Sequence, residues 1–144
     1  MLPAFEEGAL PPGIHEASWS EVVSRFGWNE RRQSLLEGLR RILDELASAG
    51  CREVWLDGSF VTEKDYPGDF DLVWSTKGVD LTMLDSVVLD VHHPRSAQKS
   101  KYGGDILPNV TEAASGMPFL DFFQQDSETG RPRGIVAMTL GNSR

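Results

Sequence analysis

Hydrophobic side chains recur at steps of three and four between Leu35 and Leu46. This spacing predicts an amphipathic helix from about Asn29 to Ala49, with one apolar face that packs against the rest of the chain. Gly50 is typical of the position just after a helix end. Upstream, the segment SWSE at 18–21 has the form of a capping box and predicts a short helix to about residue 26.

Short apolar runs predict the strands of a sheet. The strand segments are REVWLDGSF at 52–60, DFDLVWS at 69–75, GDILP at 104–108 and GIVAMTL at 134–140. Further helices are expected at 80–91 and 117–126, a loop or loose helix end at 92–104, and a turn or extended arm at 9–13. This mixture predicts an α/β or α+β fold, a small mixed sheet flanked by helices. The length favours one domain over 1–144, with residues 1–17 as an N-terminal arm.

Acidic residues outnumber basic ones, and the formal net charge is −8. Such a chain repels nucleic acid at long range, because phosphate binding needs clustered Lys and Arg. A local basic patch is still possible on the predicted long helix, which carries Arg31, Arg32, Arg40 and Arg41. A solvated helix face is the favoured interpretation of these four residues.

The chain is expected to be cytoplasmic. No apolar run approaches the ~20 residues that a membrane-spanning helix needs. The first residues lack the basic and apolar regions of a secretory signal. Cys51 is the only cysteine, so no internal disulfide can form, and a buried, unreactive thiol is expected.

The segment DGSFVTEKDYPGDFDLVW at 57–74 carries the most specific chemistry. Side chains alternate along a strand, so Asp69 and Asp71 should point the same way while Phe70 and Leu72 enter the core. Two neighbouring carboxylates raise each other's pKa unless a cation lies between them. Mg²⁺ or Mn²⁺ is the expected cation, since hard cations bind carboxylate and phosphate oxygens.

The Gly58–Ser59 pair ahead of these acids suits a phosphate. Glycine lets the backbone approach a ligand closely, and N–H groups at the start of a helical turn attract anions. Lys64 is either a further phosphate contact or a solvated lysine, and Lys99 and Lys101 are either contacts for a triphosphate tail or ordinary surface residues. Together these residues predict a site for a metal-bound nucleoside triphosphate.

Gly58–Ser59, a spacer of nine residues, and the acid–apolar–acid–apolar run from Asp69 resemble the signature of the nucleotidyltransferase superfamily that includes DNA polymerase β. The resemblance implies a minimal nucleotidyltransferase-like core and metal ligation by Asp69 and Asp71. It also implies transfer of a nucleotidyl group from a nucleoside triphosphate to an acceptor hydroxyl of an RNA end, a protein or a small molecule. A third acid on a later strand should complete such a site, and Asp105 is the first candidate, with Asp90 in reserve.

One position departs from this pattern, because Asp57 stands where the superfamily usually has an apolar residue. The whole chain also resembles a family of small bacterial and phage proteins with the motifs LPPGIH and DGSFVTEK…PGDFDLV, a resemblance that implies no activity. Small nucleotidyltransferase-like proteins often occur in toxin–antitoxin and defence pairs, which implies a partner protein.

Two alternatives are open. The chain could be a catalytically inactive protein of the same fold that acts by protein–protein contact. The run DFDLV also matches the nucleophile motif of haloacid dehalogenase-like enzymes, but that motif should follow an apolar strand, and here a Tyr-Pro-Gly turn precedes it.

Overall fold

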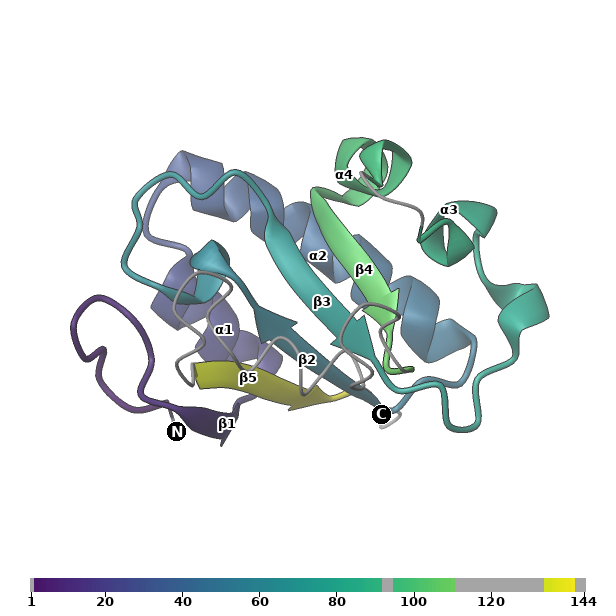
Figure 1. Cartoon of the computed structure of the whole chain (residues 1–144), viewed down its shortest axis with the longest axis horizontal. Coiled ribbons are helices and arrows are strands. Elements are labelled where there is room, and N and C mark those ends of the chain that lie inside the picture. Colours follow the sequence, from purple (N-terminus) through teal and green to yellow (C-terminus); the bar gives the residue numbers. More distant parts are fainter. Residues whose placement is uncertain (1, 92–94, 111–133, 142–144) are drawn as a thin grey trace.

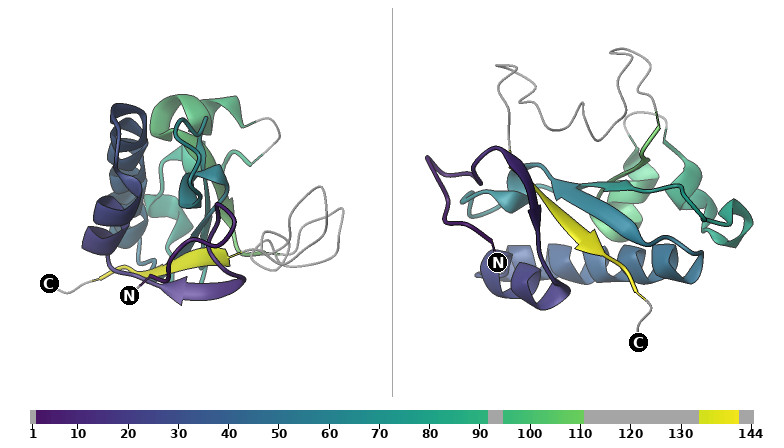
Figure 2. Two further views of the ribbon diagram at one scale, coloured as in Figure 1. Left: turned by 90° about the vertical axis from the view of Figure 1, so that its left-hand side faces the viewer. Right: turned by 90° about the horizontal axis from the view of Figure 1, so that it is seen from below.

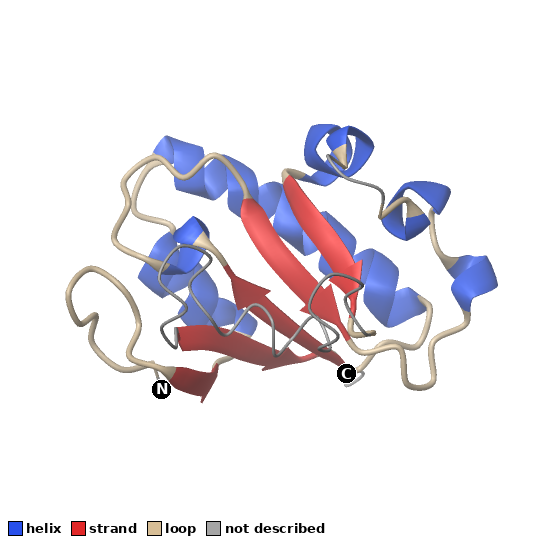
Figure 3. Ribbon diagram, viewed as in Figure 1, coloured by secondary structure: helices blue, strands red, loops and turns tan. Residues whose placement is uncertain are grey.

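The computed structural model describes residues 2–91, 95–110 and 134–141, which form a mixed sheet and several helices (Figures 1 and 3). The strands are β1 (Gly13–Glu16), β2 (Glu53–Asp57), β3 (Phe70–Trp74), β4 (Gly104–Pro108) and β5 (Gly134–Thr139). The helices are α1 (Trp19–Phe26), α2 (Glu30–Ser48), α3 (Ser86–Leu89) and α4 (Ser96–Tyr102), with 3₁₀ turns η1 (Ser59–Val61) and η2 (Leu81–Met83). The predicted fold class is confirmed.

The five strands lie in the order β1-β5-β2-β3-β4 (Figure 1). The central pairs β5–β2 and β2–β3 are antiparallel, whereas the outer pairs β1–β5 and β3–β4 are parallel. The β2–β3 connection holds the motif of the sequence analysis. The β3–β4 connection passes through α3 and α4, which pack against β4.

Helices α1 and α2 begin where their capping residues predict. The Ser18 hydroxyl accepts from the Glu21 N–H at 3.2 Å, and the Glu21 carboxylate accepts from the Ser18 N–H at 3.4 Å, which completes the capping box. Asn29 caps α2 by accepting from the Arg32 N–H at 2.9 Å. Beyond the end of α2, Gly50 has a φ of 104°, a left-handed conformation that favours glycine.

The main core lies between α2 and one face of the sheet, as the two views in Figure 2 show. Strand alternation directs Phe70, Leu72 and Trp74 to this face, where all three are buried among the leucines of α2. A smaller buried cluster occupies the opposite face and consists of Trp55, Val73, Ile135 and Ala137. Cys51 is buried, as predicted, and burial raises the pKa of its thiol.

The predictions for the β3–β4 connection were partly wrong. The helix expected over 80–91 is divided into η2 and α3, because Asp80 and Asp85 each accept the N–H two residues ahead and start a new turn. The segment expected to be a loop or loose helix end contains α4, which ends at Gly103 with a φ of 99°. The helix predicted at 117–126 lies outside the described residues.

The N-terminal segment adds an edge strand to the sheet. Residues 13–16 form β1 and pair with β5, where an arm or turn was expected. Leu2 and Leu10 are buried in the main core, and the His15 ring lies 2.7 Å from the Pro11 carbonyl oxygen. Among the described residues, no helix is long and apolar enough to cross a membrane.

Candidate active site

Three aspartates form a row across neighbouring strands. In the β2–β3 register Asp57 lies opposite Asp71, and in the β3–β4 register Asp71 lies opposite Asp105. Residues opposite each other in a sheet point to the same face, so all three carboxylates lie on the face away from α2. Asp69 comes two residues before Asp71 and joins the row from the start of β3. The sheet therefore brings Asp105, not Asp90, to the Asp69–Asp71 pair.

Asp71 is the electrostatic centre of this row. Burial raises the pKa of Asp71 to about 7, and the charges of Asp69, Asp105 and Asp57 act in the same direction. Burial and the Asp105 charge also raise the pKa of Asp69, against the opposing effect of Lys99. The direction of both shifts is the one expected of carboxylates that converge. Such a site has a deficit of positive charge at neutral pH.

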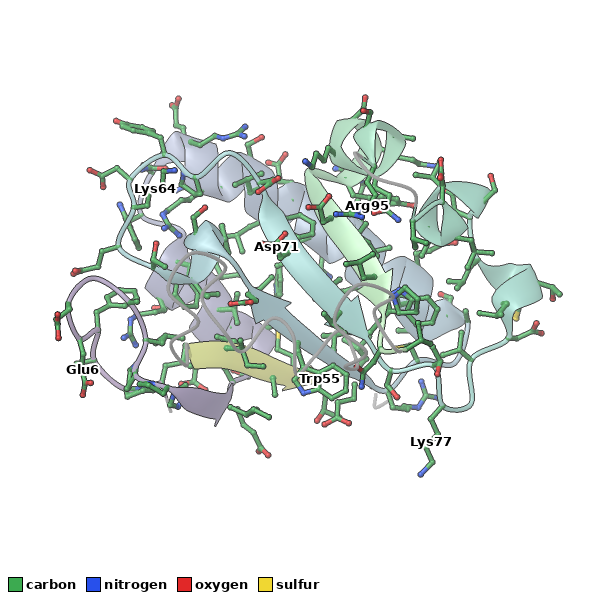
Figure 4. The ribbon with its side chains drawn as sticks, viewed as in Figure 1. Glu6, Trp55, Lys64, Asp71, Lys77 and Arg95 are labelled. Carbon is green, nitrogen blue, oxygen red and sulfur yellow. The ribbon has the colours of Figure 1, made fainter. Side chains whose placement is uncertain are left out.

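Two basic side chains partly compensate this deficit: Arg95, which precedes α4, and Lys99, in the last turn of α4. The Lys99 ammonium lies 3.7 Å from an oxygen of Asp69 and 3.8 Å from an oxygen of Asp105. The Arg95 guanidinium donates to the same Asp105 oxygen at 3.1 Å and to the Val91 carbonyl at 3.2 Å. Figure 4 shows Arg95 beside β4, close to Asp71 in the view. Lys99 therefore links Asp69 to Asp105, and Arg95 holds Asp105.

In this structure Lys99 and Arg95 offset part of the negative charge of the acids. Within residues 2–91, 95–110 and 134–141, no group of three or more His, Cys, Asp or Glu side chains is arranged to hold a metal ion. The donor set is nevertheless the one that Mg²⁺ and Mn²⁺ prefer, since it consists of carboxylate oxygens alone. A divalent ion would fit only if Lys99 and Arg95 moved away from Asp69 and Asp105.

Gly58 connects the row of acids to the Gly-Ser turn. Its φ of 87° and ψ of −170° belong to a region that is essentially restricted to glycine. A Cβ at this position would collide with the carboxylate of Asp71. The sequence predicted that the backbone at Gly58 approaches another group closely. In the structure that group is the Asp71 carboxylate. Ser59, which is half-buried, follows it and begins η1.

The nine-residue spacer between Ser59 and Asp69 is held by the start of α2. Arg32 is fully buried, and its guanidinium donates to the carbonyls of Phe60 and Thr62, each at 2.7 Å. The same group also donates to the carbonyls of Phe26 at 3.1 Å and Lys64 at 2.7 Å. Arg32 is thus the structural anchor of the motif.

Arg31 binds the other end of this spacer. Its Nε donates to the Pro67 carbonyl at 3.0 Å, and its guanidinium also bonds the Gly68 carbonyl. The solvated helix face predicted for the four arginines was wrong for Arg32, because Trp28 and Phe60 also cover its guanidinium. The spacing along α2 could have predicted that Arg32 is buried, because it stands three residues before Leu35 on the apolar face of the helix.

The remaining candidates differ in their positions. Lys64 is exposed on the spacer, where Figure 4 shows it apart from Asp71 and Arg95. Its contribution to the fold is its carbonyl oxygen, which accepts from Arg32. Asp90 ends α3 and is exposed. Asp57, the departure from the superfamily pattern, is buried within the row of acids.

Comparison with known proteins gives one match. The model of a family of unknown function, DUF6932, matches residues 3–139. No curated protein and no solved structure matches the chain.

Proposed function

The chain belongs to the DUF6932 family, and for it we propose a metal-dependent nucleotidyltransferase activity, in which a nucleotidyl group passes from a nucleoside triphosphate to an acceptor hydroxyl. The observation that carries this proposal is the convergence of Asp69, Asp71 and Asp105 beside Gly58, with a pKa of Asp71 raised to about 7 by burial and neighbouring acids. Such a group of carboxylates attracts cations. It lies next to Gly58, which has no side chain to obstruct a ligand.

Each residue has a proposed role. Asp69, Asp71 and Asp105 would hold Mg²⁺ or Mn²⁺, after Lys99 and Arg95 have moved away. Bound there, the ion would neutralise the acids and polarise the phosphate that is attacked. Gly58 and Ser59 would bind the phosphates of the triphosphate through the backbone of their turn.

The bond changes balance without any further reactant. The acceptor oxygen attacks the α-phosphorus, a new phosphorus–oxygen bond forms, and the bond to pyrophosphate breaks. The acceptor proton passes to a carboxylate of the site, for which Asp105 is our candidate. Arg95, which donates to Asp105 at 3.1 Å in this structure, would release that carboxylate before the reaction.

The decisive test is Asp71→Asn. This change removes a charge from the centre of the site and keeps the shape of the side chain, so Mg²⁺-dependent binding of triphosphate should be lost while the fold persists. Calorimetry with each nucleoside triphosphate, with and without Mg²⁺, measures the effect. Asp44→Asn is a matched control, because Asp44 is exposed on α2 and pairs with Arg40. Equal binding by the wild type and the Asp71 variant would overturn the metal assignment.

The acceptor can be found in the same system. Incubation of the protein with each labelled triphosphate and a cell extract should label one acceptor, which names the nucleotide and the acceptor together. If the wild type yields no more labelled product than Asp71→Asn does, that result counts against transfer.

One observation favours the second candidate function, an inactive nucleotidyltransferase-like protein that acts by protein–protein contact. Lys99 and Arg95 already neutralise the acids, as structural ion pairs would. In a toxin–antitoxin or defence pair, Asp69→Ala would then leave any effect of expression on growth unchanged. Loss of that effect in Asp69→Ala would favour catalysis.

A further inference from the structure

A basic pocket adjoins the row of acids. It lies between α2, α4 and the end of the spacer, and it has a volume of about 280 Å³. Its lining includes the cations Arg31, Arg41, Lys99 and Lys101, whereas Asp69 is its one carboxylate among the described residues. In a chain with a net charge of −8, this concentration of positive charge is a local exception.

Lys99 pairs with Asp69 and Asp105, and Lys101 pairs with Asp85, so the surplus positive charge of the pocket comes from Arg31 and Arg41. The hydrogen bonds of Arg31 go to the carbonyls of Pro67 and Gly68, and Arg41 donates to the Lys101 carbonyl at 2.7 Å. Carbonyl oxygens are neutral, so these bonds orient the two guanidinium groups without balancing their charge. The hydroxyl of Ser34, an exposed residue of α2, adds a further hydrogen-bonding group to the lining. Guanidinium groups held in fixed positions suit phosphate oxygens.

The position of the pocket relative to the acids indicates which phosphate it would bind. In the strand order β2-β3-β4, Gly58 and Ser59 follow β2 on one side of β3, whereas α4, which contributes to the pocket, leads into β4 on the other side (Figure 1). In an in-line displacement the attacking and leaving oxygens lie on opposite sides of the phosphorus. If pyrophosphate leaves on the side of Gly58 and Ser59, the acceptor must approach from the side of the pocket.

We infer that this pocket binds a phosphate group of the acceptor, so that the acceptor is a nucleotide or the end of a nucleic acid strand. The inference rests on the proposed function for the direction of approach, and on the cations of the pocket for the chemistry. A hydroxyl of a protein or a neutral sugar would not need the two guanidinium groups of Arg31 and Arg41 beside it. The acceptor hydroxyl would lie between the pocket and Asp105.

Binding measured without metal tests the pocket separately from the reaction. The probes are a fluorescein-labelled single-stranded RNA hexamer with a free 3′-hydroxyl, the DNA hexamer of the same sequence, and AMP, all in EDTA at low salt. Arg41→Gln should weaken binding by about 10-fold and lower the slope of its salt dependence by about one charge. Ser34→Glu, which places an acid in the pocket, should weaken binding at least as much.

Arg40→Gln is the matched control. Arg40 is the preceding residue of α2 and has the same charge, but it pairs with Asp44 and does not line the pocket. The control should bind each probe as the wild type does. If Arg41→Gln and Ser34→Glu bind the hexamers more weakly, the ligand is a strand end. If they bind only AMP more weakly, the ligand is a free nucleotide.

Two results would overturn the inference. The first is equal binding of every probe by the wild type, Arg41→Gln and Ser34→Glu. The second is found with ATP added as a fourth probe: if the pocket variants bind only ATP more weakly, the pocket belongs to the triphosphate. Neither result depends on Mg²⁺, so both are distinguishable from a failure of the Asp71→Asn test.

Discussion

At the scale of single residues, Gly58 shows how a backbone position serves the site. The residue permits a conformation that other residues avoid, and its lack of a Cβ leaves room for the Asp71 carboxylate. The sequence shows only a glycine before a serine and does not indicate how closely another group approaches it. The neighbour that requires the glycine comes from the next strand and is known only from the fold.

Gly58→Ala should therefore destabilise the protein by at least about 2 kcal/mol, through backbone strain and the collision with Asp71. Urea unfolding measures the change in the free energy of unfolding. Gly68→Ala is the matched control at the other end of the spacer, because Gly68 has no positive φ and a Cβ there meets nothing within 4 Å. Similar stabilities for the two variants would contradict this account of Gly58.

At the scale of elements, α2 both forms the core and holds the spacer before β3. Leucines of the helix form the core, while Arg31 and Arg32 hold both ends of the spacer before β3. Farther along, Gly38 lets α4 approach, because a Cβ there would collide with the Tyr102 carbonyl. This close approach places Lys99 near the acids, so the geometry of the site depends on helix packing.

Arg32→Met should cost about 3 kcal/mol or more, since the change leaves several buried carbonyls of the spacer without their donor. The substitution should also accelerate amide hydrogen exchange more in residues 60–68 than in strands β2 and β3. Arg40→Met removes an exposed arginine of the same helix, whose ion pair with Asp44 is worth at most about 1 kcal/mol. An Arg32 variant as stable as the Arg40 variant would show that the spacer does not need this anchor.

At the scale of the whole molecule, the row of acids makes stability depend on pH. The pKa of Asp71 is raised to about 7 in the folded state, far above the value of about 4 for an aspartate in an unfolded chain. Between these two pH values the folded state binds more protons than the unfolded state. Its stability therefore falls as pH rises through this window.

Asp71→Asn should abolish this contribution, because asparagine does not ionise. The free energy of unfolding of the variant, relative to that of the wild type, should rise by about 4 kcal/mol from pH 4 to pH 8. Urea unfolding across this range measures the difference, and the comparison cancels the effect of acids whose pKa is lowered, such as Asp80 and Asp85. A difference that stays constant with pH would mean that Asp71 titrates normally.

The sequence by itself determined the elements with strong local patterns. The leucine spacing and caps of α1 and α2, the apolar runs of β2 to β5, and the alternation that sets Asp69 and Asp71 on one face all follow from neighbouring residues. Local signals failed where side-chain caps compete with a helix, as Asp80 and Asp85 do in the segment predicted as one helix. They also failed for β1, whose pairing partner lies more than a hundred residues away in the sequence.

Only the tertiary structure decided which residues complete the site. Strand order places Asp105 opposite Asp71, helix packing brings Lys99 and Arg95 to the acids, and the burial of Arg32 makes an apparent surface residue an anchor. The physical reason is that these contacts join residues distant along the chain, and their geometry follows from how the elements pack. No pattern within a short segment records which distant side chain will reach it.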